Sequence, residues 1–248
     1  MITDNTTHIG FGSLLVQKLK VYIELVKMRL SLLVSFSSAF GYTLAMGGNV
    51  NWTQLVMLFI GGWAISGASC TINQVWEVKY DAIMKRTKNR PLPTNRISAN
   101  EALWFAVILA LFGILILIQW TNPLTTGLAI LSMVLYSFVY TPLKRVGPIA
   151  VFVGAIPGAL PPLLGWTAAT GDINHAALII FGIQFIWQFP HFWAIAWVGD
   201  EDYKKAGFKL LPIKGEKDMK TAFQIMTYTL FLIPLGLLPT YFGMTGIT

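Results

Sequence analysis

Seven stretches of this sequence stay apolar for about 20 residues at a time, and this feature limits the possible folds more than any other. They cover residues 30–46, 52–72, 101–120, 124–141, 148–170, 176–198 and 221–242. About 20 apolar residues are the length that a helix needs to cross a bilayer. Apolar residues make up 55% of the 248 and charged residues only 12%, which is far from the composition of a soluble domain. We therefore expect an all-α, polytopic membrane bundle of seven transmembrane helices. The Gly- and Pro-rich stretch 148–170 is a candidate for a kink or a break.

The basic residues predict the orientation of the bundle. All 18 Lys and Arg fall within residues 18–29, 79–96, 144–145 and 204–220. These are alternate connections, so they share one side, which the positive-inside rule makes the cytoplasmic side of a bacterial inner membrane. The N-terminus is then inside. The net charge of +7 reflects this topology, and we expect no nucleic-acid partner.

Three oxygen-bearing side chains recur every four residues where the second apolar stretch ends. Asn73, Glu77 and Asp81 therefore share one face of a helix, and a basic segment with Lys85, Arg86 and Arg90 follows. Mg²⁺ is usually held by one or two carboxylates together with substrate phosphates, and Lys and Arg supply further phosphate contacts. The pattern favours an anionic, diphosphate-bearing substrate with an apolar part in the bilayer. The alternative is a solvated helix end with internal ion pairs.

A second polar group is expected on the same side. Asp200, Glu201 and Asp202 follow the sixth apolar stretch, which would let two acidic clusters face each other across one cavity. Glu201 is more simply a solvated residue. His191 lies inside that stretch, where an ionisable side chain is a candidate for function, and imidazole is a ligand of heme iron. Alternatively, the histidine satisfies a carbonyl that Pro190 frees.

Several motifs together resemble a known family. They are the run from Asn73 through Glu77 and Asp81 to Lys85-Arg86-Thr87-Lys88-Asn89-Arg90-Pro91, the segment Tyr140-Thr141-Pro142-Leu143-Lys144-Arg145, and the pairs Pro190-His191 and Asp202-Tyr203. They resemble the intramembrane prenyltransferase superfamily, and within it the branch that forms heme O. The quinone-forming branches usually carry Asp where this chain has Glu77, and the segment around His191 also favours the heme branch.

The resemblance implies a reaction and a site. A farnesyl group would pass from farnesyl diphosphate to a vinyl group of heme B, and water would add to give heme O. Magnesium would be held by Asn73, Glu77, Asp81, Asp200 and Asp202. The charge of the leaving diphosphate would be neutralised by Lys85, Arg86, Arg90 and Lys144, whereas Asp202 would help to hold the magnesium from the opposite side. Heme would lie near His191, Tyr140 and Trp187. The implied partners are the lipid bilayer and either heme A synthase or the assembly of a terminal oxidase.

The sequence also departs from that family. We expect an N-terminal cytoplasmic arm over residues 1–25 and a membrane domain over residues 26–248. Members of the family usually have nine spans, so we expect this domain to be short at its C-terminus. Two alternatives therefore stay open: a prenyltransferase for quinones or other aromatic acceptors, and an inactive, truncated homologue that serves as a membrane assembly protein. A transporter is disfavoured because His191 is the main ionisable residue within the spans.

Overall fold

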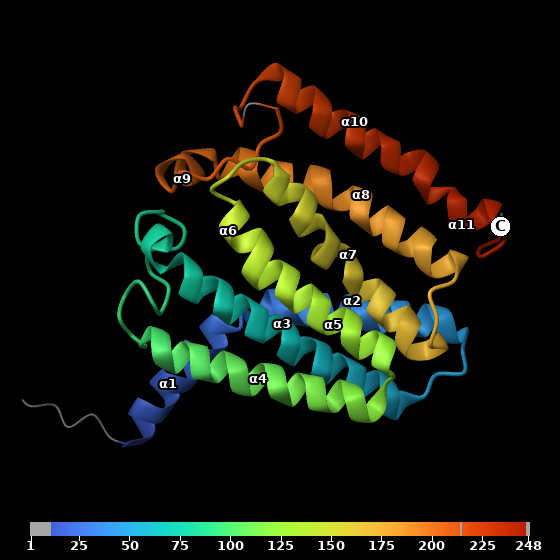
Figure 1. The fold of residues 1–248 in the computed structure, drawn as a ribbon, viewed down its shortest axis with the longest axis horizontal. Helices are drawn as coiled ribbons and strands as arrows, with labels where there is room; N and C mark the ends of the chain where they lie inside the picture. Colours follow the sequence, from blue (N-terminus) through green and yellow to red (C-terminus); the bar gives the residue numbers. More distant parts are fainter. Residues whose placement is uncertain (1–10, 214, 247–248) are drawn as a thin grey trace, which may run out of the picture.

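The computed structural model describes residues 11–213 and 215–246, and this part of the chain is helical without a strand, which confirms the predicted class (Figure 1). The elements in chain order are α1 (Phe11–Leu25), α2 (Met28–Met46), α3 (Trp52–Asp81), α4 (Ala99–Trp120), α5 (Pro123–Val134), the π-helix η1 (Leu135–Tyr140), α6 (Thr141–Leu143), α7 (Ile149–Thr170), α8 (His175–Val198), α9 (Asp200–Lys205), α10 (Met219–Gly236) and α11 (Leu238–Tyr241).

All seven apolar stretches are helical, and six of them are long and apolar enough to cross a membrane: Trp52–Asp81, Ala99–Trp120, Pro123–Leu143, Ile149–Thr170, His175–Val198 and Met219–Tyr241. The remaining one is α2, which is 19 residues long. Its buried face carries Ser31, Ser35 and Ser38, because small side chains let membrane helices approach closely. These serines lower the mean hydropathy of α2, although the helix lies within the bundle between α3 and α7.

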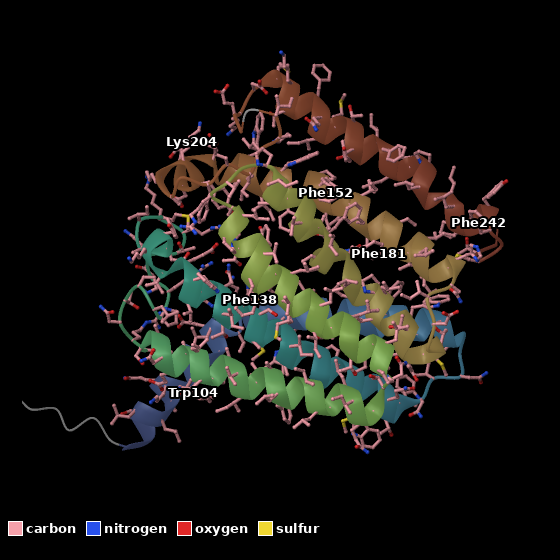
Figure 2. All side chains as sticks on the ribbon, in the orientation of Figure 1. Trp104, Phe138, Phe152, Phe181, Lys204 and Phe242 are labelled. Atoms are coloured by element: carbon pink, nitrogen blue, oxygen red, sulfur yellow. The ribbon has the colours of Figure 1, made fainter. Side chains whose placement is uncertain are left out.

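The outer surface of the bundle is apolar, as a surface in contact with lipid requires. Trp104, Phe138 and Phe152, labelled in Figure 2, come from three different helices, and each is at least half exposed. Helix α10 packs mainly against α8 and leaves most of its apolar side chains uncovered at one edge of the bundle (Figure 1).

The crossing of α2 and α7 is the closest helix contact that bears on the site. A Cβ added at Gly165 would overlap the backbone of Ser38, and one added at Gly41 would overlap the backbone of Pro162. Only glycine fits at these two positions, which is the small-residue packing typical of membrane helices. Helix α7 is a single continuous helix despite Pro157, Pro161 and Pro162.

The span Pro123–Leu143 contains an irregular segment that the sequence did not predict. Between α5 and α6 the span continues as the π-helix η1, whose extra residue per turn changes the direction of the side chains that follow. The Thr141 hydroxyl donates to the Tyr136 carbonyl at 2.8 Å within this segment. The π-helix brings Tyr136, Tyr140 and Thr141 toward the interior of the bundle, where Tyr140 and Thr141 are buried.

Residues 1–10 of the predicted arm lie outside the described residues, and the rest of the arm is α1. This helix packs through Val21 and Leu25 onto the segment between α3 and α4. Lys27 separates α1 from α2 with a left-handed backbone, φ 47° and ψ 59°. The division at residue 25 stays a prediction.

The described basic connections all lie at one end of the bundle, as the charge pattern predicted. Figure 1 shows α1, the α3–α4 connection, α6 and α9 at that end, while the α2–α3, α4–α5 and α7–α8 connections lie at the other.

Candidate functional site

The face of α3 predicted from the sequence is buried. Asn73, Glu77 and Asp81 are only 1%, 5% and 0% exposed. The alternative of a solvated helix end is therefore wrong. Helix α3 is 30 residues long and carries these polar groups past the end of its apolar stretch, into the space that the α3–α4 connection covers.

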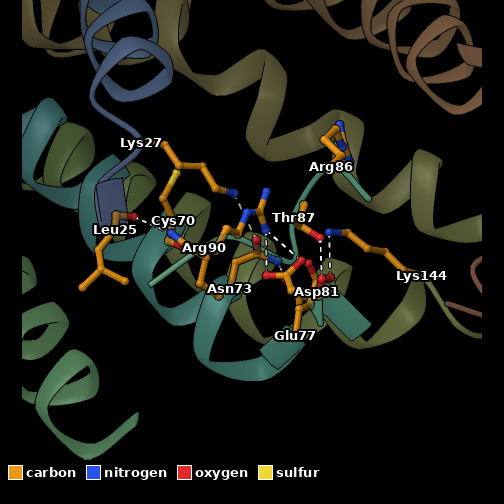
Figure 3. Close-up of polar contacts among 12 residues, drawn as sticks. Leu25, Lys27, Cys70, Asn73, Glu77, Asp81, Arg86, Thr87, Arg90 and Lys144 are labelled. Carbon is orange, nitrogen blue, oxygen red and sulfur yellow. Dashed lines mark hydrogen bonds and ion pairs between the residues drawn. The ribbon is translucent and has the colours of Figure 1, made fainter. Parts of the chain in front are cut away.

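Each carboxylate on this face is paired with a cation from another segment. Lys144, just after α6, contacts Glu77 through a 2.8 Å Nζ–Oε1 ion pair. Arg90, on the α3–α4 connection, donates from Nη1 to both Asp81 oxygens at 2.9 and 2.7 Å. Figure 3 shows the two pairs side by side. Buried charges are expected to be paired in this way, because an isolated buried charge is costly.

Asn73 has two different partners. Its Nδ2 donates to the Thr141 hydroxyl at 3.0 Å, and its Oδ1 accepts from Lys27 Nζ at 3.3 Å (Figure 3). From the sequence, Lys27 counted only as a charge that sets the topology. Burial lowers the pKa of its ammonium group, and the cations of Arg90 and Lys144 lower it further. The sequence feature that could have indicated a role for Lys27 at the site is its position just before the first apolar stretch.

A cavity of about 630 Å³ extends from this charged cluster into the bundle. Its charged end is lined by Glu77, Asp81, Arg86, Arg90, Lys144 and Lys27. Its body is lined by apolar and small side chains of α2, α3, α5, α7 and α8, among them Val34, Ile65 and Leu164. The cavity can thus hold a molecule with an anionic head and an apolar tail.

Aromatic rings lie at the junction of the two parts of the cavity. Lys144 Nζ lies 4.7 Å from the centroid of the Tyr140 ring and 5.9 Å from that of Phe208. Tyr136 packs on Tyr140 with 5.5 Å between ring centroids. Ring faces attract cations, so this junction favours positive charge on a bound molecule as well as on Lys144. Phe208 was not predicted; it comes from the segment after α9.

His191 lines the same cavity from α8, one turn from Trp187. The two rings are stacked, with centroids 4.4 Å apart and an interplanar angle of 16°. Among the described residues nothing hydrogen-bonds to this imidazole, so it does not satisfy a carbonyl freed by Pro190. His191 lies seven positions before Val198, where α8 ends, or about 10 Å along the helix.

The cavity is open on the side between α2 and α8. Its lining there includes Leu30 and Leu33 of α2 and Trp187 and Ile195 of α8, all of which are exposed. Both helices pack against α7. Trp187 lies in the middle of α8, whereas Leu30 and Ile195 lie near the helix ends that carry the charged residues, so the exposed apolar lining runs from the charged end toward the middle of the bundle.

The second acidic cluster lies outside this cavity. Asp202 accepts hydrogen bonds from the backbone N–H groups of Lys85 and Arg86 at 3.0 and 3.1 Å. These two bonds hold the pKa of the Asp202 carboxyl below its usual value. Asp200 pairs with Lys204 at 2.8 Å. Asp200, Asp202 and Lys85 line a neighbouring hollow of about 360 Å³ instead.

Arg86 is the link between the two hollows. Its guanidinium donates to the Tyr203 hydroxyl at 2.9 Å and lies 5.3 Å from the centre of that ring, while both residues line the main cavity. Through Asp202 and Tyr203, α9 is thus docked onto the α3–α4 connection above the charged end.

The donor set suits a divalent cation only in part. In the described portion of the chain no three His, Cys, Asp or Glu side chains gather as a metal site. Glu77, Asp81 and the Asn73 amide offer two carboxylates and one neutral oxygen around the charged end. That set fits Mg²⁺ when substrate phosphate oxygens complete the coordination. The structure does not bring Asp200 or Asp202 to these residues.

Comparison with known proteins gives three concordant results. Residues 34–248 match the family described as the UbiA prenyltransferase family. A protein of Cytophaga hutchinsonii named protoheme IX farnesyltransferase is 51% identical over 92% of this chain and 80% of its own length. One of the same name from Flavobacterium psychrophilum is 49% identical over 90% of this chain and 74% of its own length.

Solved structures share the fold. A digeranylgeranylglyceryl phosphate synthase aligns with a TM-score of 0.75 and 22% identity, over 93% of this chain and 80% of that one. A UbiA homologue from Archaeoglobus fulgidus, described as bound to DMAPP and Mg²⁺, aligns with a TM-score of 0.67 and 18% identity, over 88% of this chain and 74% of the other.

Proposed function

Because this chain belongs to the UbiA prenyltransferase family, we propose that it transfers a farnesyl group from farnesyl diphosphate to a vinyl group of heme B, forming heme O. The chain is an integral membrane prenyltransferase by family and by its apolar helices. The heme acceptor and the farnesyl donor are supported by relatives that carry the name protoheme IX farnesyltransferase at 38–51% identity.

The observation that carries this proposal is the shape and charge of the cavity. A charged end with four cations and two carboxylates continues into an apolar body, which matches a diphosphate joined to an isoprenoid chain. The side opening between α2 and α8 gives both apolar substrates a path from the lipid. We propose the cytoplasmic membrane as the location, with the charged end on the cytoplasmic side.

Mg²⁺ is proposed as the cofactor, held by Asn73, Glu77 and Asp81 with the diphosphate. When bound, the metal supplies neutralisation of the diphosphate as it departs. Without a ligand, Lys144 and Arg90 neutralise Glu77 and Asp81. Both side chains also line the charged end of the cavity, where they can stabilise the negative charge of a bound diphosphate. The participation of Asp200 and Asp202 stays a prediction, since it requires α9 to move.

The reaction balances without a redox partner. The bond between C1 of the farnesyl group and the diphosphate oxygen breaks, and diphosphate leaves. The vinyl carbon bonds to C1, and water adds its oxygen to the neighbouring carbon and loses a proton. Tyr140 and Tyr136 lie at the junction of the charged end and the apolar body, so their ring faces would stabilise positive charge that develops on the allylic carbon.

The proposed heme site is the wall of the cavity formed by α8. The stacked pair of Trp187 and His191 offers a flat surface beside a ring nitrogen that is free of protein partners in the described chain. A porphyrin can stack on such a surface, and imidazole can ligate its iron. Tyr140 lies between this wall and the charged end, since it contacts Phe192 of α8 at 5.7 Å between centroids.

The test is a product assay with purified protein. Incubation with heme B, farnesyl diphosphate and Mg²⁺ should yield a heme heavier by a hydroxyfarnesyl addition in mass spectrometry, and chelation of the metal should stop its formation. A parallel incubation with an aromatic quinone precursor tests the alternative acceptor. Prenylation of that precursor alone would overturn the heme assignment, and inactivity toward both acceptors by folded protein would favour an assembly protein.

A further inference from the structure

Among the three cations that contact the α3 motif, Lys27 has the longest contact and is the one that faces no carboxylate. Arg90 and Lys144 each face a carboxylate at 2.7–2.8 Å, whereas Lys27 faces the neutral amide oxygen of Asn73 at 3.3 Å. In the described chain Lys27 forms no ion pair. Lys27 is partly buried where it lines the cavity, and a desolvated charge without a paired counter-charge is costly. An anionic ligand in the cavity would supply that counter-charge.

The backbone at Lys27 gives a second, independent indication. Its φ of 47° lies in the left-handed region, which costs an L-residue free energy that glycine would not pay. The conformation turns the chain between α1 and α2 and starts α2, because the Lys27 carbonyl accepts from Leu30 N at 2.8 Å and Ser31 N at 3.1 Å. A lysine at such a turn calls for a reason in its side chain.

The orientation of the Asn73 amide is fixed through its nitrogen. Thr141 Oγ1 donates to the Tyr136 carbonyl, so it accepts from Asn73 Nδ2 and fixes the orientation of the amide. The amide oxygen therefore points to Lys27 and the charged end. This is the oxygen that a metal ion would need from Asn73, and the ammonium of Lys27 now occupies it (Figure 3).

We propose that Lys27 is an exchangeable cation that couples metal binding to diphosphate binding. Without ligand it holds the Asn73 amide oxygen. If Asn73 held a divalent metal by that oxygen, the ammonium would be displaced, and its flexible stem would let it reach the diphosphate. The inference rests on the proposed function, since it assigns a role at the same site. Lys27 is a binding and positioning residue here.

The proposal predicts effects of opposite sign in one variant. In Lys27→Gln, Mn²⁺ alone should bind several-fold more tightly than to the unchanged chain, because no ammonium competes for the Asn73 oxygen. Pyrophosphate in the presence of Mn²⁺ should bind about tenfold to a hundredfold more weakly, the size expected for one lost charge-assisted hydrogen bond. Both affinities can be measured by titration of the full chain in lipid nanodiscs, with Mn²⁺ followed by paramagnetic resonance.

Two further variants make the test independent of folding. Lys27→Gly removes the ammonium and suits the left-handed backbone, so it should fold and repeat both effects. Lys88→Gln removes an exposed cation of the α3–α4 connection that does not line the cavity, and it should change neither affinity.

The outcomes separate this inference from the proposed function. If the unchanged chain binds no pyrophosphate with Mn²⁺, the proposed function itself fails. If it binds pyrophosphate and both Lys27 variants bind it equally well, only the role of Lys27 is overturned. If Mn²⁺ alone and pyrophosphate both bind more weakly to Lys27→Gly, Lys27 only supports Asn73 and the exchange does not occur.

Discussion

At the scale of single residues, the site consists of oxygen-bearing groups on one helix, each held by a cation that comes from elsewhere in the chain. Lys27, Lys144 and Arg90 reach Asn73, Glu77 and Asp81 respectively. A buried pair of this kind is costly to break by removing one partner, because the other charge is left unpaired. The same contacts keep the carboxylates oriented before substrate binds.

The pair of Glu77 and Lys144 should respond to mutation as a unit. Glu77→Gln is expected to lower the free energy of unfolding by about 3 kcal/mol, since it leaves the Lys144 ammonium buried without a counter-charge. Lys144→Met added to it should restore most of that loss. Thermal unfolding in detergent measures both. Prenyl transfer should be absent from both proteins, and equal instability of the single and double variants would contradict the pairing.

His191 should affect the acceptor and not the donor. His191→Ala is expected to weaken heme B binding by at least about tenfold if the imidazole contacts the porphyrin or its iron. Binding of Mn²⁺ with pyrophosphate should be unchanged, because the charged end is contributed by other residues. Absorbance titration with heme B measures the first quantity. His175→Ala, at the opposite end of α8, is the matched control. Unchanged heme affinity in folded protein would remove His191 from the site.

The sequence predicted the residues on α3 and could not predict their surroundings. A four-residue period places Asn73, Glu77 and Asp81 on one face regardless of the rest of the fold. Their burial depends on Lys144, 67 residues from Glu77, and on Lys27, 46 residues from Asn73. No periodicity joins positions so far apart. Motif resemblance did find Lys144 and Arg90, whereas Lys27, Phe208 and the stacking of Trp187 on His191 required coordinates.

At the scale of helices, the crossing of α2 and α7 fixes one wall of the cavity. Ser38 and Val34 of α2 and Leu164 and Pro161 of α7 line it, so the distance between these helices sets its width. That distance depends on Gly41 and Gly165, where any Cβ would meet backbone of the other helix.

Gly165→Ala should therefore be more damaging than an ordinary helix substitution. Its Cβ would meet backbone atoms that cannot rotate away, and a cost of about 1–3 kcal/mol in the free energy of unfolding is expected from overpacking. Gly182→Ala on α8 is the control, because nothing lies within 4 Å of the added atom. Alanine favours helix over glycine, so this control should be neutral or slightly stabilising. Similar melting temperatures of the two variants would refute the close crossing.

The docking of α9 should depend on pH through Asp202. Its carboxylate accepts from two backbone N–H groups, which depresses its pKa in the folded protein. The docking is then complete above the ordinary pKa of an aspartic acid and is lost as pH falls through the depressed value. Hydrogen-exchange protection of the Lys85 and Arg86 amides, corrected for intrinsic rates, measures it.

Asp202→Asn should remove this pH dependence and lower the protection at neutral pH, since a neutral amide oxygen is the weaker acceptor. Glu201→Gln on the same short helix should behave as the unchanged chain. Protection that is identical in all three proteins would mean that Asp202 does not hold the connection.

Local patterns predicted the elements unevenly. Apolar runs located all the long helices, because each run must be buried or face lipid along its length. They did not reveal η1, since an apolar run is compatible with a π-helix as well as with an α-helix, nor α1, whose apolar and basic residues also suited an irregular arm.

For the whole molecule, the placement of charge defines two different ends. Every described Lys and Arg lies in or next to the end that carries the site, and the opposite connections have none. The Lys and Arg residues that would bind an anionic substrate thus belong to the same set that sets the orientation of the protein in the membrane.

Accessibility to a reagent that cannot cross membranes tests this orientation. In intact cells, Asn49→Cys on the α2–α3 connection should be labelled, and Lys88→Cys on the α3–α4 connection should be labelled only after the membrane is permeabilised. Cys70 is buried and can be replaced by serine to remove background. Labelling of the Lys88→Cys chain in intact cells would reverse the assignment.

The opening between α2 and α8 changes what substrate concentration means for this molecule. A ligand that enters from the lipid reaches the opening by lateral diffusion in the plane of the bilayer. Its encounter rate therefore depends on its mole fraction in the bilayer and not on its amount per litre. Adding empty vesicles that fuse with the proteoliposomes, at constant total heme and isoprenoid, should then slow turnover in proportion to the added lipid. The turnover rate would then saturate with the mole fraction of substrate in the bilayer. A change in membrane composition that alters this mole fraction would change the turnover rate as directly as a soluble inhibitor does.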